Sequence, residues 1–118
     1  VPLIMDQTGL TADSTGVKYE SARIKIDTTN VSSIILRATW SASQTDSVTA
    51  IELYDVTGAA VVDSLSGNSG TDQEKTITPS SLTSGNLFEL RVNVTTASAT
   101  AGATTDVKYA VLEFVYTL

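Results

Sequence analysis

Residues 33–42 read Ser33-Ile34-Ile35-Leu36-Arg37-Ala38-Thr39-Trp40-Ser41-Ala42, and this stretch decides the fold. Its even-numbered positions are all apolar, whereas the odd-numbered positions between them are mostly polar. Alternation with a period of two places the two sets of side chains on opposite faces of a β-strand. The stretch therefore predicts a half-buried strand whose even-numbered side chains face a core.

The same period of two recurs on both sides of this stretch. Ile24 and Ile26 alternate with charged residues, whereas Val17 and Tyr19 follow the opposite phase, which predicts a β-bulge near residues 21–22. The predicted core consists of Ile24, Ile26, Ile34, Leu36, Trp40, Phe88, Leu90, Val92, Leu112 and Phe114.

The closing segment, residues 107–118, is apolar on both faces of its predicted strand. One face carries Lys108, Ala110, Leu112, Phe114 and Tyr116, and the other carries Val107, Tyr109, Val111 and Val115. A strand that is apolar on both faces is expected to be central in its sheet or covered on both sides.

Turn signals separate these strands. Residues 48–56 and 59–65 predict a hairpin in which Gly58 supplies a positive φ, and residues 66–70 and 80–86 are rich in turn-forming residues. A short strand at residues 76–78 is expected to end at Pro79. With seven or eight short strands and no helical period, the chain is predicted to be all-β, a single antiparallel β-sandwich of jelly-roll or Greek-key type.

The first five residues, Val1-Pro2-Leu3-Ile4-Met5, are apolar, and the polar residues that follow are read as a linker. This reading divides the chain into an N-terminal strand and linker, residues 1–16, and a β-sandwich domain, residues 17–118. The apolar strand must bury its side chains somewhere. It can lie at the edge of its own sandwich, where Pro2 is tolerated, or it can add to the sheet of another molecule.

Composition excludes several classes of function. The net charge is −6, and the seven Lys and Arg residues are scattered, which argues against nucleic acid or an anionic membrane surface as a partner. No apolar run approaches the roughly 18 residues of a membrane span, so no membrane insertion of the mature chain is expected. Ser and Thr account for 33 of the 118 residues, which makes the surface polar through hydroxyl groups rather than charges.

The residues that most enzymes use are missing. The chain has no His and no Cys, which removes Ser–His and Cys–His nucleophiles and the usual zinc ligands. Its carboxylates follow no calcium-loop pattern. We therefore expect no catalytic residues, no metal and no cofactor, and we do not expect an enzyme.

Two glycosylation sequons point outside the cell. Asn30-Val31-Ser32 lies in a predicted turn, and Asn93-Val94-Thr95 places Asn93 on the face opposite Val92. If both are used, N-linked glycans are partners of the chain. Removal of a signal peptide is one explanation of a start at Val1, and a proteolytic start is another.

Residues 51–58, 87–92 and 110–115 resemble strands of extracellular jelly-roll modules. The apolar N-terminal strand, the hydroxyl-rich surface, the sequons and the lack of Cys and His also resemble subunits of archaeal extracellular threads and pili, which assemble by donor-strand complementation. This resemblance implies an extracellular structural subunit that polymerises with other copies of itself into a surface filament. The residues that would fill a groove in the neighbouring subunit are Val1, Leu3, Ile4 and Met5.

Two other functions fit the same sequence. One is a carbohydrate-binding module, which requires exposed aromatic rings such as Tyr54 could provide. The other is a viral capsid or turret protein, which uses the jelly roll in closed, symmetric assemblies.

Overall fold

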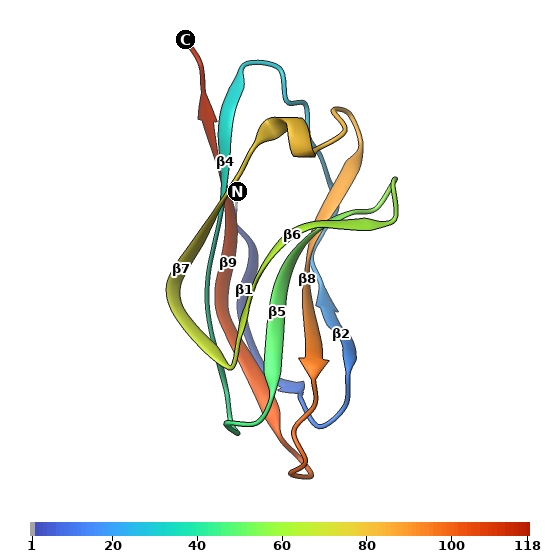
Figure 1. The fold of residues 1–118 in the computed structure, drawn as a ribbon, viewed down its shortest axis with the longest axis vertical. Helices are drawn as coiled ribbons and strands as arrows, with labels where there is room; N and C mark the ends of the chain where they lie inside the picture. Colours follow the sequence, from blue (N-terminus) through green and yellow to red (C-terminus); the bar gives the residue numbers. More distant parts are fainter. Residues whose placement is uncertain (1) are drawn as a thin grey trace.

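The computed structural model describes residues 2–118, with side chains described from residue 4 onward. Two antiparallel sheets pack face to face in a body that measures 49 × 26 × 19 Å (Figure 1). The first sheet, sheet A, has the strand order β1 (Pro2–Thr11), β9 (Thr104–Tyr116), β4 (Val31–Ala42) and β7 (Ser69–Ile77). The second, sheet B, has the order β2 (Gly16–Glu20), β8 (Leu87–Thr96), β5 (Val48–Asp55) and β6 (Ala60–Gly67).

The order of the strands is that of a jelly roll. The hydrogen-bonded neighbours include β1 with β9, β2 with β8, β4 with β7, and β5 with β6. These pairs are what results when one long antiparallel hairpin is rolled into two facing sheets. The predicted all-β sandwich is confirmed, with nine strands among the described residues rather than seven or eight. The ninth is β3 (Ile24–Lys25), which pairs with β8; a single short helix, η1 (Pro79–Ser81), joins β7 to β8.

The core lies between the two sheets, where the alternation placed it. Leu36 and Leu90 are fully buried, and Ile24 and Phe114 are partly buried against the same cluster. The other predicted core residues, Ile26, Ile34, Trp40, Phe88, Val92 and Leu112, are buried. This burial of apolar side chains is the main stabilising term for a fold without disulfides.

The pairing of β2 with β8 shifts register between Val17 and Tyr19, earlier than the bulge predicted near residues 21–22, and a further irregularity lies at Ser21. The Ser21 N–H donates to the carbonyl of Leu90 at 2.9 Å, and the Leu90 N–H donates back to Ser21 Oγ, also at 2.9 Å. A side-chain oxygen thus replaces a main-chain acceptor here. This lets the chain shift phase between β2 and β3 while both remain on β8.

Two predictions of local geometry are wrong. The positive φ of the β5–β6 turn belongs to Ala59, at 53°, and Gly58 serves another purpose. The Gly58 N–H donates to Asp55 Oδ1 at 2.8 Å, and a Cβ on Gly58 would lie 2.9 Å from Asp55 Oδ2. A side chain at position 58 would therefore require the Asp55 carboxylate to shift.

The second error concerns β9. Val107 and Leu112 are both buried, although simple alternation puts them on opposite faces. The pairing with β4 shifts between Thr39 and Trp40, so β9 carries one extra residue at Lys108. This bulge turns Val107 inward. The strand is central, between β1 and β4, but its outer face is not covered by any described segment, and Val115 is exposed there.

The polar residues after Met5 do not form a linker as predicted. β1 continues to Thr11 along β9, and the polar stretch fits because β1 lies at an edge and departs from regular geometry. Asp6 has a φ of 52° and Gly9 a φ of 70°. Edge strands commonly contain such irregularities, since only one of their sides must pair.

Candidate functional site

The N-terminal half of β1, residues 2–7, is here called the arm. It pairs with β9 of its own sheet, with Ile4 opposite Ala110 and Met5 opposite Tyr109. Ile4 is 1% exposed and belongs to the core, whereas Met5 is 60% exposed on the outer face of sheet A. The arm is therefore an edge element held by main-chain pairing and, among the side chains described from residue 4 onward, by one buried anchor.

Only part of the predicted donor segment can be placed. Val1 lies outside the described residues, and of Leu3 only the main chain in β1 is described. Of the two open alternatives for this segment, pairing within its own sandwich is what the single chain adopts.

A break at Thr8 and Gly9 separates the arm from the rest of β1. The register with β9 shifts between Gln7 and Leu10, and Gly9 has a positive φ. The Gly9 N–H donates to the Asp106 carboxylate at 2.7 Å. Glycine adopts such a φ at little cost, which makes this the natural pivot of the strand.

The chain beyond the pivot is firmly attached. The Ala12 N–H donates to the Ala103 carbonyl at 2.9 Å, and the Ala12 carbonyl accepts from the Ser98 N–H at 2.8 Å. Ala12 is also fully buried with Val94 and Ala103. The hydrogen bonds of Ala12 therefore attach the start of β2 independently of the pairing between the arm and β9.

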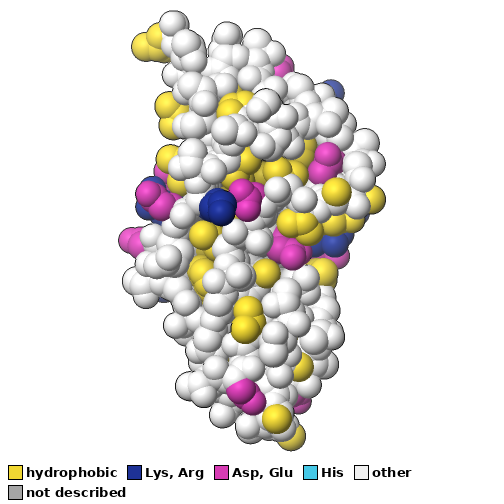
Figure 2. All heavy atoms as spheres, in the orientation of Figure 1, with side chains coloured by type: hydrophobic (Ala, Val, Ile, Leu, Met, Phe, Trp, Pro, Cys, Tyr) yellow, Lys and Arg dark blue, Asp and Glu magenta, His cyan; other side chains and the backbone are white. Residues whose placement is uncertain are grey.

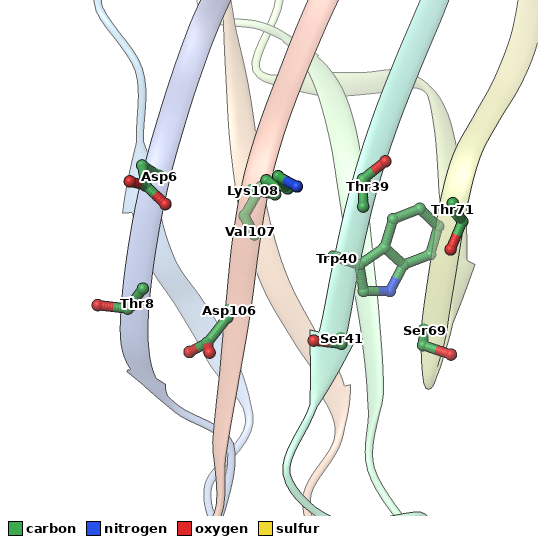
Figure 3. A pocket seen from close by; sticks show the side chains of 10 residues that line it. All are labelled: Asp6, Thr8, Thr39, Trp40, Ser41, Ser69, Thr71, Asp106, Val107 and Lys108. Atoms are coloured by element: carbon green, nitrogen blue, oxygen red, sulfur yellow. The ribbon is translucent and has the colours of Figure 1, made fainter.

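A shallow cavity of about 490 Å³ lies on the outer face of sheet A (Figure 3). Its side chains come from all four strands of the sheet, and most are hydroxyls or carboxylates, including Asp6 and Asp106. Trp40 contributes to its wall, but the indole is buried between β4 and β7 (Figure 3). A neighbouring apolar hollow is formed by Met5, Tyr109 and Val111.

The outer face of sheet B carries a charged cluster instead of a binding platform. Arg91 Nε donates to Glu89 at 3.0 Å, and the Arg91 guanidinium lies 3.4 Å from the centroid of the Tyr54 ring. Tyr54 is the exposed ring that a carbohydrate-binding module could have used. The Arg91 guanidinium covers this ring. The cluster was not predicted, and its only signal is Glu89 and Arg91 two residues apart on one strand.

The two sequons differ in their surroundings. Asn30 is exposed in the turn before β4 and has a φ of 62°. Asn93 lies in the central strand β8 of sheet B, and its Nδ2 donates to Glu52 at 3.2 Å. A glycan on Asn30 would disturb no hydrogen bond of that side chain in the described structure, whereas a glycan on Asn93 would replace its bond to Glu52.

The described residues contain no group of three or more His, Cys, Asp or Glu side chains placed to hold a metal. Among them there is also no helix with the length and apolarity needed to cross a membrane. Comparisons with protein-family models, with curated proteins and with solved structures found no match to this chain. The arm and its pairing with β9 are the feature on which a function can be argued.

Proposed function

We propose that this protein is an extracellular structural subunit that joins copies of itself into a filament by exchanging the arm between neighbours. The observation that carries the proposal is the arm itself: an edge segment with a glycine pivot and one fully buried anchor, Ile4. The role is structural and non-enzymatic, and the surface sequon at Asn30 fits a glycosylated exterior.

The mechanism follows from the identity of the copies. Any groove that one subunit's arm fills in its own sheet can accept the same arm from another copy, with the same hydrogen bonds and the same side-chain contacts. Burial of Ile4 contributes roughly 1.5–3 kcal/mol in either arrangement. The balance between the two therefore depends on concentration and on the conformation that residues 8–9 adopt in each arrangement. Head-to-tail exchange produces an open chain of subunits.

Cysteine chemistry tests the exchange, because the natural chain has no Cys. Met5 and Tyr109 lie directly opposite each other, and facing positions on paired strands are close enough for a disulfide. In the Met5→Cys/Tyr109→Cys variant, oxidation after concentration should give a ladder of covalent oligomers on a non-reducing gel. Monomers and dimers alone would contradict a filament joined by the arm.

A matched control uses a pair that stays within one chain. Ile35 on β4 and Thr76 on β7 are also opposite each other on sheet A. The Ile35→Cys/Thr76→Cys variant should form its disulfide without any ladder. A ladder in this control would mean that oxidation joins subunits nonspecifically.

The jelly-roll strand order also supports a second candidate, a capsid or turret subunit, since that fold is common in viral shells. Electron microscopy of the concentrated protein separates the two: fibres support the filament, and closed shells support the capsid.

A further inference from the structure

The outer face of sheet A carries two neighbouring hollows, the polar cavity of about 490 Å³ and the apolar one of about 530 Å³. Asp6 and Lys108 line both, so the two hollows form one depression, here called the trough. Its polar part crosses the sheet from β1 to β7 (Figure 3). Four strands at about 4.8 Å from one to the next span about 14 Å. The trough is therefore shaped for an extended ligand that lies across the strands.

The polar part of the trough is lined by hydrogen-bonding groups of several kinds. Asp6 and Asp106 provide carboxylates, Lys108 provides an ammonium group, and five Ser and Thr residues provide hydroxyl groups. Ser41 on β4 and Ser69 on β7 are exposed, and neither hydroxyl group has a hydrogen-bond partner among the described residues. Asp106 uses one carboxylate oxygen to accept from the main chain of β1, and its other oxygen has no described partner.

Charged groups elsewhere on this face already compensate one another. Arg37 lies 2.8 Å from Glu74 and donates to Glu113 at 3.1 Å. In the trough, Lys108 forms no ion pair with a described carboxylate, although two aspartates line the same hollow. The Arg37 network is satisfied within the sheet, whereas the groups around the trough are available to a ligand.

The apolar part of the trough adds an aromatic ring. Tyr109 is half-buried and lines the trough with Met5 and Val111. Tyr109 lies opposite Met5 in the register, and the side chains of facing residues share one side of a sheet. On sheet B, by contrast, the Tyr54 ring is covered by Arg91. An aromatic ring beside available polar groups is therefore found on sheet A.

We infer that the trough binds a neutral polysaccharide. A pyranose ring has C–H groups on one face and hydroxyl groups around its edge, so it needs an apolar surface and several hydrogen-bonding groups at once. Tyr109 provides the surface for the C–H face. The carboxylates of Asp6 and Asp106 accept from sugar hydroxyl groups, and Lys108 donates to sugar oxygens.

Charge selects neutral sugars over acidic ones. The trough has two carboxylates and one ammonium group, and the chain has a net charge of −6. Both repel a polysaccharide that carries carboxylate or sulfate groups. A neutral chain of hexoses avoids this repulsion and still bonds to the polar groups of the trough.

The trough is complete only while an arm is paired with β9, because Met5 and Asp6 belong to the arm. An arm from the same chain and an arm from another copy supply the same side chains. The inference therefore does not rest on arm exchange, and it adds attachment to a polysaccharide-coated surface to the structural role.

Electrophoresis in native gels that contain a polysaccharide tests the inference. The probes are mannan, dextran, soluble starch and hydroxyethylcellulose, each compared with a gel without polysaccharide, and alginate is the acidic comparison. We expect at least one neutral polysaccharide to slow the protein and alginate to leave its migration unchanged. Unchanged migration with all four neutral polysaccharides, or equal slowing by alginate, would overturn the inference.

Two substitutions show whether the trough is responsible. Tyr109→Ala should weaken the binding at least about tenfold, because it removes a large apolar contact. Its control is Tyr116→Ala, on the same strand but outside the trough, which should bind like the natural chain. Lys108→Met, at an exposed position that does not pack in the core, should also weaken the binding, and its control Lys25→Met should not. Unchanged binding by both trough variants would place the sugar elsewhere and contradict the inference.

The filament and the sugar site can fail separately. The protein is kept dilute in these gels, whereas the ladder of the Met5→Cys/Tyr109→Cys variant forms after concentration. A ladder without slowing would overturn only the sugar site, and slowing without a ladder would overturn only the filament.

Discussion

At the scale of single residues, Glu89 is a buried carboxylate that the fold must compensate. It lies on the outer face of sheet B and yet is 1% exposed, with Arg91 as its ion-pair partner. Burying one member of an ion pair is costly unless its partner lies beside it, and Arg91 Nε is 3.0 Å from the Glu89 carboxylate. Alternation with the buried Phe88 and Leu90 puts Glu89 on the outer face. The pattern gives the direction of a side chain but not how far its neighbours cover it.

We expect the Arg91→Met variant to lose about 3 kcal/mol of unfolding free energy, because it leaves the Glu89 carboxylate buried without its cation. Urea unfolding at neutral pH measures this loss. Glu20→Ala is the control, since Glu20 is exposed and 3.9 Å from Arg91, and it should cost less than about 1 kcal/mol. Adding Glu89→Gln to Arg91→Met should recover part of the loss; no recovery would mean that packing, and not charge, is responsible.

At the scale of elements, β7 is predicted only in part, since the short strand expected at residues 76–78 covers just the end of Ser69–Ile77. Residues 69–75 are polar and show no alternation, so residues 66–70 were read as a turn. The reason is that β7 lies at the edge and faces solvent over most of its length. Lys75 pairs with Leu36 in the register, on the inner side, and its Nζ lies 4.0 Å from Asp63 of β6. An inward-facing lysine is an edge feature that hydrophobic patterns cannot reveal.

Gly70 on β7 lies opposite Trp40 on β4, and its lack of a side chain leaves room for the indole ring. A Cβ on this residue would lie 2.6 Å from Cη2 of the Trp40 ring, which is too close for either to remain in place. We expect Gly70→Ala to lower the unfolding free energy by about 1–3 kcal/mol, through overpacking against a rigid indole. Circular dichroism during urea unfolding measures it. In a Trp40→Phe background the smaller ring should reduce the effect, and an undiminished loss would place its cause elsewhere.

The N-terminal strand shows what a pattern leaves undetermined. Five apolar residues predict a strand and a need for burial, and Ile4 is indeed buried. A period of two identifies the inner face of a strand but not the molecule that supplies the rest of the sheet. The irregular residues Asp6 and Gly9 hid the continuation of β1, because their bulged geometry breaks the alternation that reveals strands.

At the scale of the whole molecule, the sandwich could be predicted because its central strands obey a single period. In Figure 2 hydrophobic atoms appear in separate small groups among polar ones on this face of the body, as expected for a chain rich in hydroxyl residues. The sequence left the strand order open between a jelly roll and a Greek key, since the order depends on pairings between distant segments such as β1 with β9.

The carboxylates of Asp27 and Asp46 accept hydrogen bonds from neighbouring loops at two separate places on the sandwich. Asp27, after β3, accepts from the Thr29 N–H at 2.9 Å and from Ser84 Oγ at 3.3 Å. Asp46, between β4 and β5, accepts from the Ala99 N–H at 3.0 Å. The pKa of Asp27 is lowered chiefly by the hydrogen bond from the Thr29 main chain, and the pKa of Asp46 chiefly by the hydrogen bond from Ser98.

These shifts predict acid sensitivity. A carboxyl whose pKa is lower in the folded state binds more protons when unfolded, so its contribution is complete above the unfolded pKa of about 3.9 and is lost as the pH falls through the folded value. We expect the unfolding midpoint in urea to fall between about pH 4 and pH 2. The Asp27→Asn/Asp46→Asn variant should show a smaller fall over the same range, and an unchanged pH profile would contradict the assignment.

The single Trp40 has a consequence for observing this protein. Its indole is buried, and its Nε1 donates to the Gly67 carbonyl at 3.1 Å, where β6 turns into β7. Its fluorescence emission should therefore be blue-shifted and should report on that corner of the sandwich. Because β7 and β1 lie at opposite edges of sheet A, release of the N-terminal segment would be nearly invisible to this fluorophore, whereas global denaturation would shift its spectrum to the red.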